Sequence, residues 1–523
     1  MSRARHPLGI DRLRAPRAGV RWNAVCNGSA RVRSTMVIAG WGLAMWQLLL
    51  AGSPAWAQEP HHRAGGEIAG QPVRFATTCR PTVAGVLDRG VHQLHTLALD
   101  DAIETFRLAA HSDVDCRMAY WGTAMAHWAR FSRSADPNTL AAGWQALDQA
   151  ALLHRPASPR EQRFLEAVHL RFRHRLVDGP RRYAAAMTAL ADAFPADPHA
   201  VWFAAAARLE QPVNTAAEAT AAGHDALALL DRPTVPAGHV VTGFYKLVAG
   251  DTPALAHRVA ELARALADDP DLPARLLRAP QQIFARLGRW ADAIAIGERS
   301  VDGARRVGAA GDELLALDGL VLAQLQAGRI DEARAIARRL DGGYLAHASG
   351  VDVQAARARI AARILLDTDD TTAAAALALP DDAAPTALAP RLFARVLGAA
   401  ALGRGDDAAA GARRLDGIAA RPGTAPETTR LARAAGAWAA MAAARADDAL
   451  AQLRAVADEE DHAVDGGLRM PLRPAREQLA DLLRLLRRDG EAAATYRQTL
   501  ARWPGRRRAS TALEAQGRDR RVD

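Results

Sequence analysis

A short pattern that recurs about every 40 residues constrains the fold of this 523-residue chain more than any other feature. A small residue is followed five positions later by alanine, and apolar residues at helical spacing come after it. The interval from Ala333 to Ala408 is nearly twice the others and leaves room for a degenerate copy. The clearest copies begin at Gly288, Gly328 and Gly403, and weaker ones begin at Leu97, Ala444 and Arg487.

Each part of the pattern has a structural reading. Glycine at the first position ends one helix in a left-handed conformation, and the acidic residues that follow it favour the start of the next helix. Alanine lets the two helices approach closely. Such a helical hairpin keeps one apolar face uncovered, so hairpins must stack on one another. The pattern therefore predicts an all-α solenoid of stacked hairpins.

The rest of the sequence agrees with that fold class. Half of the residues are hydrophobic but only 5% are aromatic, and no run with alternating polarity is long enough to predict a strand. Alanine-rich amphipathic runs predict helices near 81–96, 98–111, 115–129, 138–153, 158–174, 181–194, 197–209, 214–230, 238–249, 253–267, 273–286, 290–305, 310–326, 330–340, 350–367, 388–403, 405–420, 425–441, 446–458, 472–487 and 490–502.

Punctuation and composition divide the chain into parts. Proline- and glycine-rich breaks at 341–350 and 380–390 are the expected boundaries between helical arrays. The predicted parts are a leader over 1–57, a flexible linker over 58–74, an N-terminal array over 75–345, a C-terminal array over 346–503 and a basic tail over 504–523.

The leader has the pattern of a secretory signal peptide. An uncharged apolar run over 36–51 follows Arg31 and Arg33, and an Ala-x-Ala sequence ends at Ala57. Cleavage between Ala57 and Gln58 would release a chain without a membrane span into the periplasm or the medium. The alternative is that the same run stays attached as a membrane anchor.

The charge is concentrated at the two ends of the chain. The formal net charge is +9, of which residues 1–57 contribute +7 and residues 502–523 contribute +4, so the body between them carries −2. A nucleic-acid-binding protein is expected to carry a basic surface on its folded part. The nearly neutral body gives no reason to expect a nucleic-acid partner.

Two cysteines remain after the leader, Cys79 and Cys116. An even number suits an oxidising compartment, and both precede predicted first helices of successive hairpins, which would run parallel as neighbours. A bridge would close a loop of about 36 residues and stabilise the chain by roughly 4 kcal/mol. The alternative is two buried thiols that never meet.

The repeated unit resembles the tetratricopeptide repeat, because apolar residues follow the alanine as they do there: Phe106, Leu453 and Tyr496. The segment from Phe75 to Gly122, with its two cysteines, a Leu-His pair and Ala-Tyr-Trp-Gly, is similar to the opening of exported bacterial tetratricopeptide repeat proteins of unassigned function. The resemblance extends to about residue 300. It implies a superhelix that binds a protein or peptide partner.

The search for chemistry returns no catalytic motif, so we expect neither an enzyme nor a cofactor. The sequence has no G-x-S-x-G, no Walker-type phosphate loop and no haem-attachment motif. His92 and His95 lie three positions apart on one predicted helix, and His127 and His239 could join them. A metal- or ligand-dependent envelope protein with a site built from these histidines is therefore the alternative to a protein-interaction scaffold.

In tetratricopeptide repeats the first helix of each hairpin lines the concave face, so the resemblance implies a groove. Three arginines in one predicted helix would make its centre basic and suited to an acidic segment or a terminal carboxylate. The alternative is that these side chains only solvate one face. The predicted groove residues are Arg275, Arg278, Gln282, Arg286, Asp318, Gln326, Glu477, Asp481 and Arg484.

Overall fold

The computed structural model of the chain describes residues 72–134, 137–173, 178–213, 215–340, 342–348, 350–380, 383–422, 424–463 and 470–519. The chain divides into two units, 1–61 and 62–523, and every described residue belongs to the second unit. The predicted leader and the cleavage site between Ala57 and Gln58 lie outside the described residues. The boundary at 345/346 stays a prediction.

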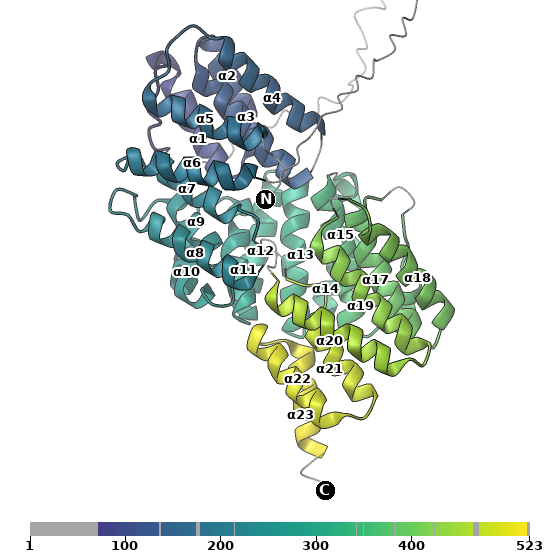
Figure 1. The fold of residues 1–523 in the computed structure, drawn as a ribbon. Coiled ribbons are helices and arrows are strands. Elements are labelled where there is room, and N and C mark those ends of the chain that lie inside the picture. Colours follow the sequence, from purple (N-terminus) through teal and green to yellow (C-terminus); the bar gives the residue numbers. More distant parts are fainter. Residues whose placement is uncertain are drawn as a thin grey trace, which may run out of the picture. The chain divides into compact units, whose positions relative to one another are not determined.

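Every regular element in the described ranges is a helix, which confirms the all-α prediction (Figure 1). Three short 3-10 helices are Pro81–Val83, Ala256–Val259 and Gly343–His347. The α-helices are α1 Ala84–His95, α2 Leu99–Ser112, α3 Arg117–Ser134, α4 Pro137–Leu152, α5 Pro159–Arg173, α6 Gly179–Ala193, α7 Pro198–Leu209, α8 Ala216–Leu230, α9 Val240–Gly250, α10 Ala260–Asp268, α11 Ala274–Arg286, α12 Trp290–Arg306, α13 Ala310–Gln326, α14 Ile330–Leu340, α15 Val351–Asp367, α16 Thr371–Ala375, α17 Pro385–Ala401, α18 Gly405–Ala419, α19 Pro426–Ala442, α20 Ala446–His462, α21 Ala475–Leu485, α22 Asp489–Arg502 and α23 Arg507–Asp519.

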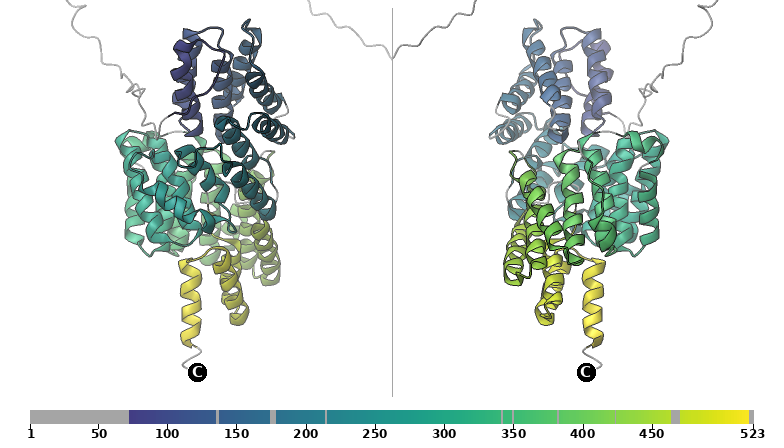
Figure 2. Two further views of the ribbon diagram at one scale, coloured as in Figure 1. Left: turned by 90° about the vertical axis from the view of Figure 1, so that its left-hand side faces the viewer. Right: turned by 90° about the vertical axis from the view of Figure 1, so that its right-hand side faces the viewer.

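Consecutive helices pack together as hairpins, and the hairpins stack in chain order (Figures 1 and 2). The odd-numbered first helices also contact one another, as α11 contacts α13, α13 contacts α15 and α15 contacts α17. Buried apolar side chains form two clusters, one centred on helices up to α15 and the other on α15 to α23. The stacking that the repeat pattern predicts is therefore present.

The first residue of each copy of the repeat, called its mark below, adopts the left-handed backbone that the pattern predicts. Gly288, Gly328 and Gly403 have φ angles of 69°, 80° and 70°. The weaker marks do the same without glycine, since Leu97, Ala444 and Arg487 have φ angles of 63°, 60° and 58°. Each mark is followed by a buried alanine, and these are Ala102, Ala293, Ala333, Ala408, Ala449 and Ala492.

The degenerate copy of the repeat that the interval from Ala333 to Ala408 leaves room for is present. Asp369 has a φ of 53°, and Ala374, five positions later, is buried between its neighbours. Asp370 caps the short helix α16 by accepting a hydrogen bond from the Ala373 N–H. The interval of 75 residues therefore contains a degenerate hairpin whose second helix has only five residues.

Two expectations about the C-terminal half are wrong. Residues 504–523 are not simply a tail, because helix α23 covers Arg507–Asp519 and Arg506 is only 1% exposed. The proline-rich stretch 380–390 does not separate helices throughout, because α17 begins at Pro385 and contains Pro390. Pro385 is tolerated at the first helical position, where an N–H would have no acceptor within the helix, whereas Pro390 lies inside the helix and removes one helical hydrogen bond.

The left-handed non-glycine marks give a stability test. Ala444 is exposed, so Ala444→Gly removes backbone strain without removing buried contacts and should raise the free energy of unfolding by about 0.5–1 kcal/mol. Ala443→Gly is the matched control, because Ala443 is also exposed but has a φ of −89°, and it should be neutral or destabilising. Urea unfolding measures both, and equal effects would contradict the assignment.

Candidate functional site

The first helices do not present the exposed basic groove that the sequence predicts. Arg286 is 3% exposed, its Nε donates to Asp251 Oδ1 at 2.6 Å, and its guanidinium lies 5.6 Å from the Trp503 ring centre. Arg275 donates to the main-chain carbonyl of Thr96 at 2.7 Å. The prediction of three arginines on one open surface is wrong, because the chain itself covers Arg286.

A smaller set of the predicted residues does meet at one cleft. Arg278, Gln282 and Asp318 line a narrow cleft between α11, α13 and α15 that encloses about 30 Å³. The Gln282 side chain is 7% exposed, and its Nε2 has no acceptor among the described residues. The remaining lining residues are Gln281, Ala285, Leu315, Gly319, Leu322, Asp352, Ala356, Arg359, Arg363 and Met470.

Two glycines shape the wall of this cleft around Gln281. A Cβ atom at Gly297 would lie 2.4 Å from Gln281 Nε2, and one at Gly319 would lie 2.7 Å from Gln281 Oε1. With glycine at both positions, Gln281 fits between α12 and α13 and donates to the Ala293 carbonyl at 3.3 Å. The amide wall of the cleft is therefore fixed by close packing.

Two arginines of α15 hold a non-helical segment at the rim of the cleft. Arg359 donates to Met470 O at 2.7 Å, and Arg363 donates to Pro471 O at 3.2 Å. Burial lowers the pKa of Arg363 to about 10, so it stays protonated at neutral pH. Burial also opposes the charge of Arg359, but the carboxylates of Glu427 and Asp318 outweigh it and raise that pKa.

The remaining predicted groove residues form a buried ion-pair network instead. Glu477 is fully buried and accepts two hydrogen bonds from Arg506, at 2.7 and 3.1 Å. Asp481 is paired with Arg473 and accepts from the Tyr496 hydroxyl at 2.5 Å. Of the residues predicted for this part of the groove, only Arg484 is exposed. The mixed C-terminal groove is therefore filled by the chain's own residues.

The segment that fills it is residues 503–508, held mainly at helix ends. Trp290 Nε1 donates to Gly505 O at 2.7 Å, and the Arg507 N–H donates to Gln326 Oε1 at 3.1 Å. Arg507 also donates to the carbonyls of Leu325 and Asp367, in the last turns of α13 and α15. The carbonyls in the last turn of a helix accept no hydrogen bond from within the helix, so a cationic donor such as arginine stabilises them.

Three of the four predicted histidines, His92, His95 and His239, lie together with His199, which the sequence analysis missed. His95 Nε2 lies 3.2 Å from His199 Nδ1, and the His92 and His239 rings lie 6.0 Å apart, centre to centre. His199 follows the Pro-Ala-Asp-Pro sequence at the start of α7, and its spacing from the other histidines carries no signal. Within the described ranges, no three of these histidines form a group close enough to hold a metal ion.

The hydrogen bonds of this cluster fix its protons. Val73 O only accepts, so His199 Nε2, 3.1 Å away, must be the donor. In the neutral ring His199 Nδ1 then accepts from His95 Nε2, and His95 Nδ1 accepts from the Tyr245 hydroxyl at 3.0 Å. Burial lowers the pKa of His199 to about 4 and that of His95 well below its usual value. Both rings are therefore neutral at pH 7.

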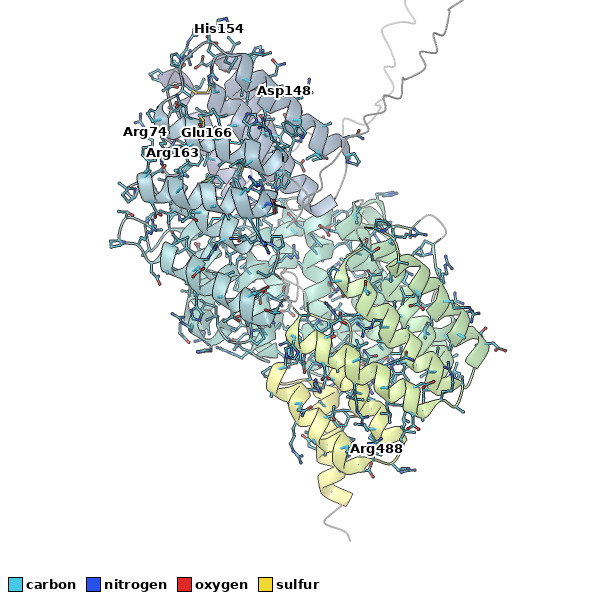
Figure 3. All side chains as sticks on the ribbon, in the orientation of Figure 1. Arg74, Asp148, His154, Arg163, Glu166 and Arg488 are labelled. Carbon is cyan, nitrogen blue, oxygen red and sulfur yellow. A yellow bond between two sulfur atoms is a disulfide. The ribbon has the colours of Figure 1, made fainter. Side chains whose placement is uncertain are left out.

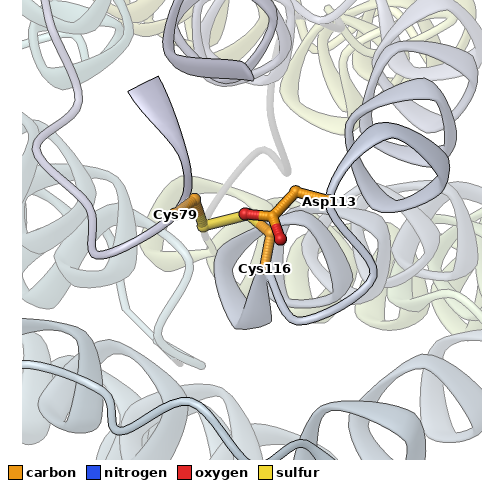
Figure 4. A group of neighbouring side chains, drawn as sticks. All are labelled: Cys79, Asp113 and Cys116. Carbon is orange, nitrogen blue, oxygen red and sulfur yellow. A yellow bond between two sulfur atoms is a disulfide. The ribbon is translucent and has the colours of Figure 1, made fainter. Parts of the chain in front are cut away.

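Cys79 and Cys116 lie at bonding distance (Figure 4), with 2.09 Å between the sulfur atoms and 4.8 Å between the Cα atoms. Asp113 lies beside them. Among the described residues, these three form the one group of potential metal ligands that lie close together. Its carboxylate accepts from Arg155 at 2.9 Å, which lowers its pKa. With the sulfurs bonded to each other, no thiolate remains to hold a metal.

No family model and no curated protein matches the sequence. Among solved structures, the human IFIT1 dimer with m7Gppp-AAAA is 11% identical with a TM-score of 0.38, covering 84% of this chain and 90% of that one. Yeast Tom70 is 10% identical with a TM-score of 0.30, covering 84% and 90%. Aspartyl phosphate phosphatase F from Bacillus subtilis is 10% identical with a TM-score of 0.29, covering 82% and 95%. In the described residues, no helix has both the length and the hydropathy to cross a membrane.

The buried ion pair predicts a large effect from one substitution. Arg506→Met leaves the Glu477 carboxylate buried without its main cation and should lower the free energy of unfolding by about 3–5 kcal/mol. The double variant Arg506→Met with Glu477→Gln should lose less. Arg518→Met, at an exposed position of α23, is the control for urea unfolding. If Arg506→Met matched this control, the pair of Arg506 with Glu477 would not be what holds residues 503–508 in place.

The histidine relay predicts how stability depends on pH. His199 gains a proton near pH 4 when folded but near 6.5 when unfolded, so the unfolded state binds more protons between these values. The contribution of His199 to the free energy of unfolding should be fully present above pH 6.5. It should fall by on the order of 3 kcal/mol as the pH drops to 4.

Urea unfolding at pH 4.5 and 7 measures this loss. The His199→Gln side chain keeps a donor and an acceptor but does not titrate. Between pH 7 and 4.5 this variant should therefore lose less free energy of unfolding than the unmodified protein, by the amount that protonation of one histidine contributes. His154→Gln, at an exposed position labelled in Figure 3, should behave as the unmodified protein does. An unchanged loss in His199→Gln would show that the relay does not set this dependence.

Proposed function

We propose that this chain is a non-catalytic scaffold of the cell envelope that binds a non-helical segment of a partner protein in the cleft between α11, α13 and α15. The observation that carries the proposal is the way Arg359 and Arg363 hold the carbonyls of Met470 and Pro471 at the cleft's rim. Side chains of the first helices already bind main chain there, and a partner's main chain offers the same groups.

Hydrogen-bonding capacity in the cleft supports a ligand rich in acceptors. Gln282 Nε2 and Arg363 Nε are donors without an acceptor among the described residues. Leaving such a donor unsatisfied costs about 1–3 kcal/mol, so carbonyl or carboxylate oxygens that reach these side chains would be favoured. The three arginines of the lining are balanced by Asp318, Asp352 and the Glu427 that accepts from Arg359, so the unsatisfied donors and not a net charge favour the ligand.

Location in the envelope is the second part of the proposal. It is supported by the apolar run over 36–51, the Ala-x-Ala ending at Ala57 and the even number of cysteines after it. The chain recovered from a periplasmic fraction should therefore begin at Gln58, as intact-mass measurement can determine. A cytoplasmic chain of full length would contradict export without bearing on the cleft.

Selection from a display library of random peptides tests the cleft. Peptides retained by the oxidised chain should bind at least tenfold more weakly to the double variant Arg278→Ala with Gln282→Ala. Arg329→Ala, at an exposed position after α13, is the matched control and should leave the affinity unchanged. Selected peptides that bind the double variant and the control equally well would place binding elsewhere and refute the proposal.

A further inference from the structure

We propose that the N-terminal array contains a second binding site, for an extended segment with an aromatic anchor. The chain's own residues 73–80, called the arm below, occupy this site in cis. The disulfide between Cys79 and Cys116 decides whether a partner's segment can replace the arm. This site is separate from the cleft of α11, α13 and α15, so the two proposals stand or fall independently.

The arm is held through its main chain by side chains of four different parts of the array. The bonds are Phe75 N to Asp88 Oδ1 at 2.7 Å, Thr78 N to Glu161 Oε1 at 2.7 Å, Arg80 N to Asp113 Oδ2 at 2.8 Å, Arg160 Nη1 to Ala76 O at 2.7 Å and His199 Nε2 to Val73 O at 3.1 Å. Main-chain groups are the same in any sequence, so these contacts would serve another segment equally well.

Exposure along the arm alternates as it does in an extended chain. Residues 74, 76, 78 and 80 are exposed, whereas 73, 75, 77 and 79 are partly or fully buried. A period of two is that of a strand, in which successive side chains point to opposite sides. The outward side chains therefore contribute little to apolar packing, although the Thr78 hydroxyl donates to Glu161 and Arg80 pairs with Asp113.

One inward side chain supplies the anchor. Phe75 is 2% exposed and stacks on Trp121, with the ring centres 5.4 Å apart. The rings of Phe164 and His199 meet it edge-on at 5.5 and 5.2 Å, and the Arg160 guanidinium lies 4.4 Å from its centre. This enclosure favours an aromatic ring, because one ring stacks on its face, two rings meet it edge-on and a guanidinium lies over it.

The disulfide adds a second covalent link at the C-terminal end of the arm, which the chain already joins to α1 through the 3-10 helix Pro81–Val83. The bridge removes the freedom that this joint leaves to the arm, and in this way it controls exchange. Cys79 belongs to the arm and Cys116 immediately precedes α3, so the bridge keeps the arm next to its own site. A tethered occupant acts at a high effective concentration and excludes a competitor. A dithiol breaks the S–S bond by giving two electrons and two protons, leaving two thiols and the oxidised dithiol. After that the arm is retained by the five main-chain bonds, by Phe75, by the Thr78 hydroxyl on Glu161 and by the ion pair of Arg80 with Asp113.

A labelled peptide of residues 72–80 that carries Cys79→Ser is the probe, and fluorescence polarisation is the readout. The full chain is compared in three forms: oxidised, Cys79→Ser, and Cys79→Ser with Phe75→Ala. Affinity should rise in that order, with at least a tenfold gain from the oxidised chain to the double variant. A probe that also carries Phe75→Ala should bind the double variant at least tenfold more weakly.

Three results would overturn the proposal. The oxidised chain could bind the probe as tightly as the double variant, or no form could bind it. The double variant could also fail to fold even with excess probe, as judged by circular dichroism, which would make the arm part of the core. If the variant folds better with the probe than without it, the arm acts in trans and the proposal is supported.

Discussion

The structure depends on close approach of neighbouring first helices at small residues. Phe106 of α2 is fully buried against Gly90 of α1 and Gly122 of α3, where added Cβ atoms would lie 2.8 and 2.3 Å from its ring. No hairpin covers its own apolar face, so each must bring its first helix against the next one. This stacking places the polar side chains of successive first helices beside one another, and the sites described above consist of those side chains.

The same interaction recurs in three places: a buried or half-buried polar side chain of the array holds the main chain of a non-helical segment. His199 and Arg160 hold residues 73–80, Arg359 and Arg363 hold residues 470–472, and Trp290 holds Gly505. Arginine suits this task because its planar group offers five donors in a fixed geometry and remains charged when buried. A helical array with such side chains is suited to hold polypeptide, whether its own or a partner's.

The sequence predicted the fold well because the fold depends on local and periodic features. Helical periodicity, the left-handed marks and the buried alanines all act within a few residues, and even the degenerate copy at Asp369 follows the spacing. The site was predicted only in part. Arg278, Gln282 and Asp318 meet at the cleft as expected for first helices, but Arg286, Gln326, Glu477 and Asp481 are covered by residues 503–508 or their neighbours. The bond between Gln326 and Arg507 spans 181 positions, and no local pattern reports a contact of that range.

Amide hydrogen exchange of the oxidised chain tests most directly whether the array binds non-helical main chain. The amides of Phe75, Thr78 and Arg80 belong to no helix but donate to the carboxylates of Asp88, Glu161 and Asp113. They should exchange at least about a hundredfold more slowly than in an unstructured peptide, as stable hydrogen-bonded amides do. Exchange of these three amides at the rate of a free peptide would contradict the account.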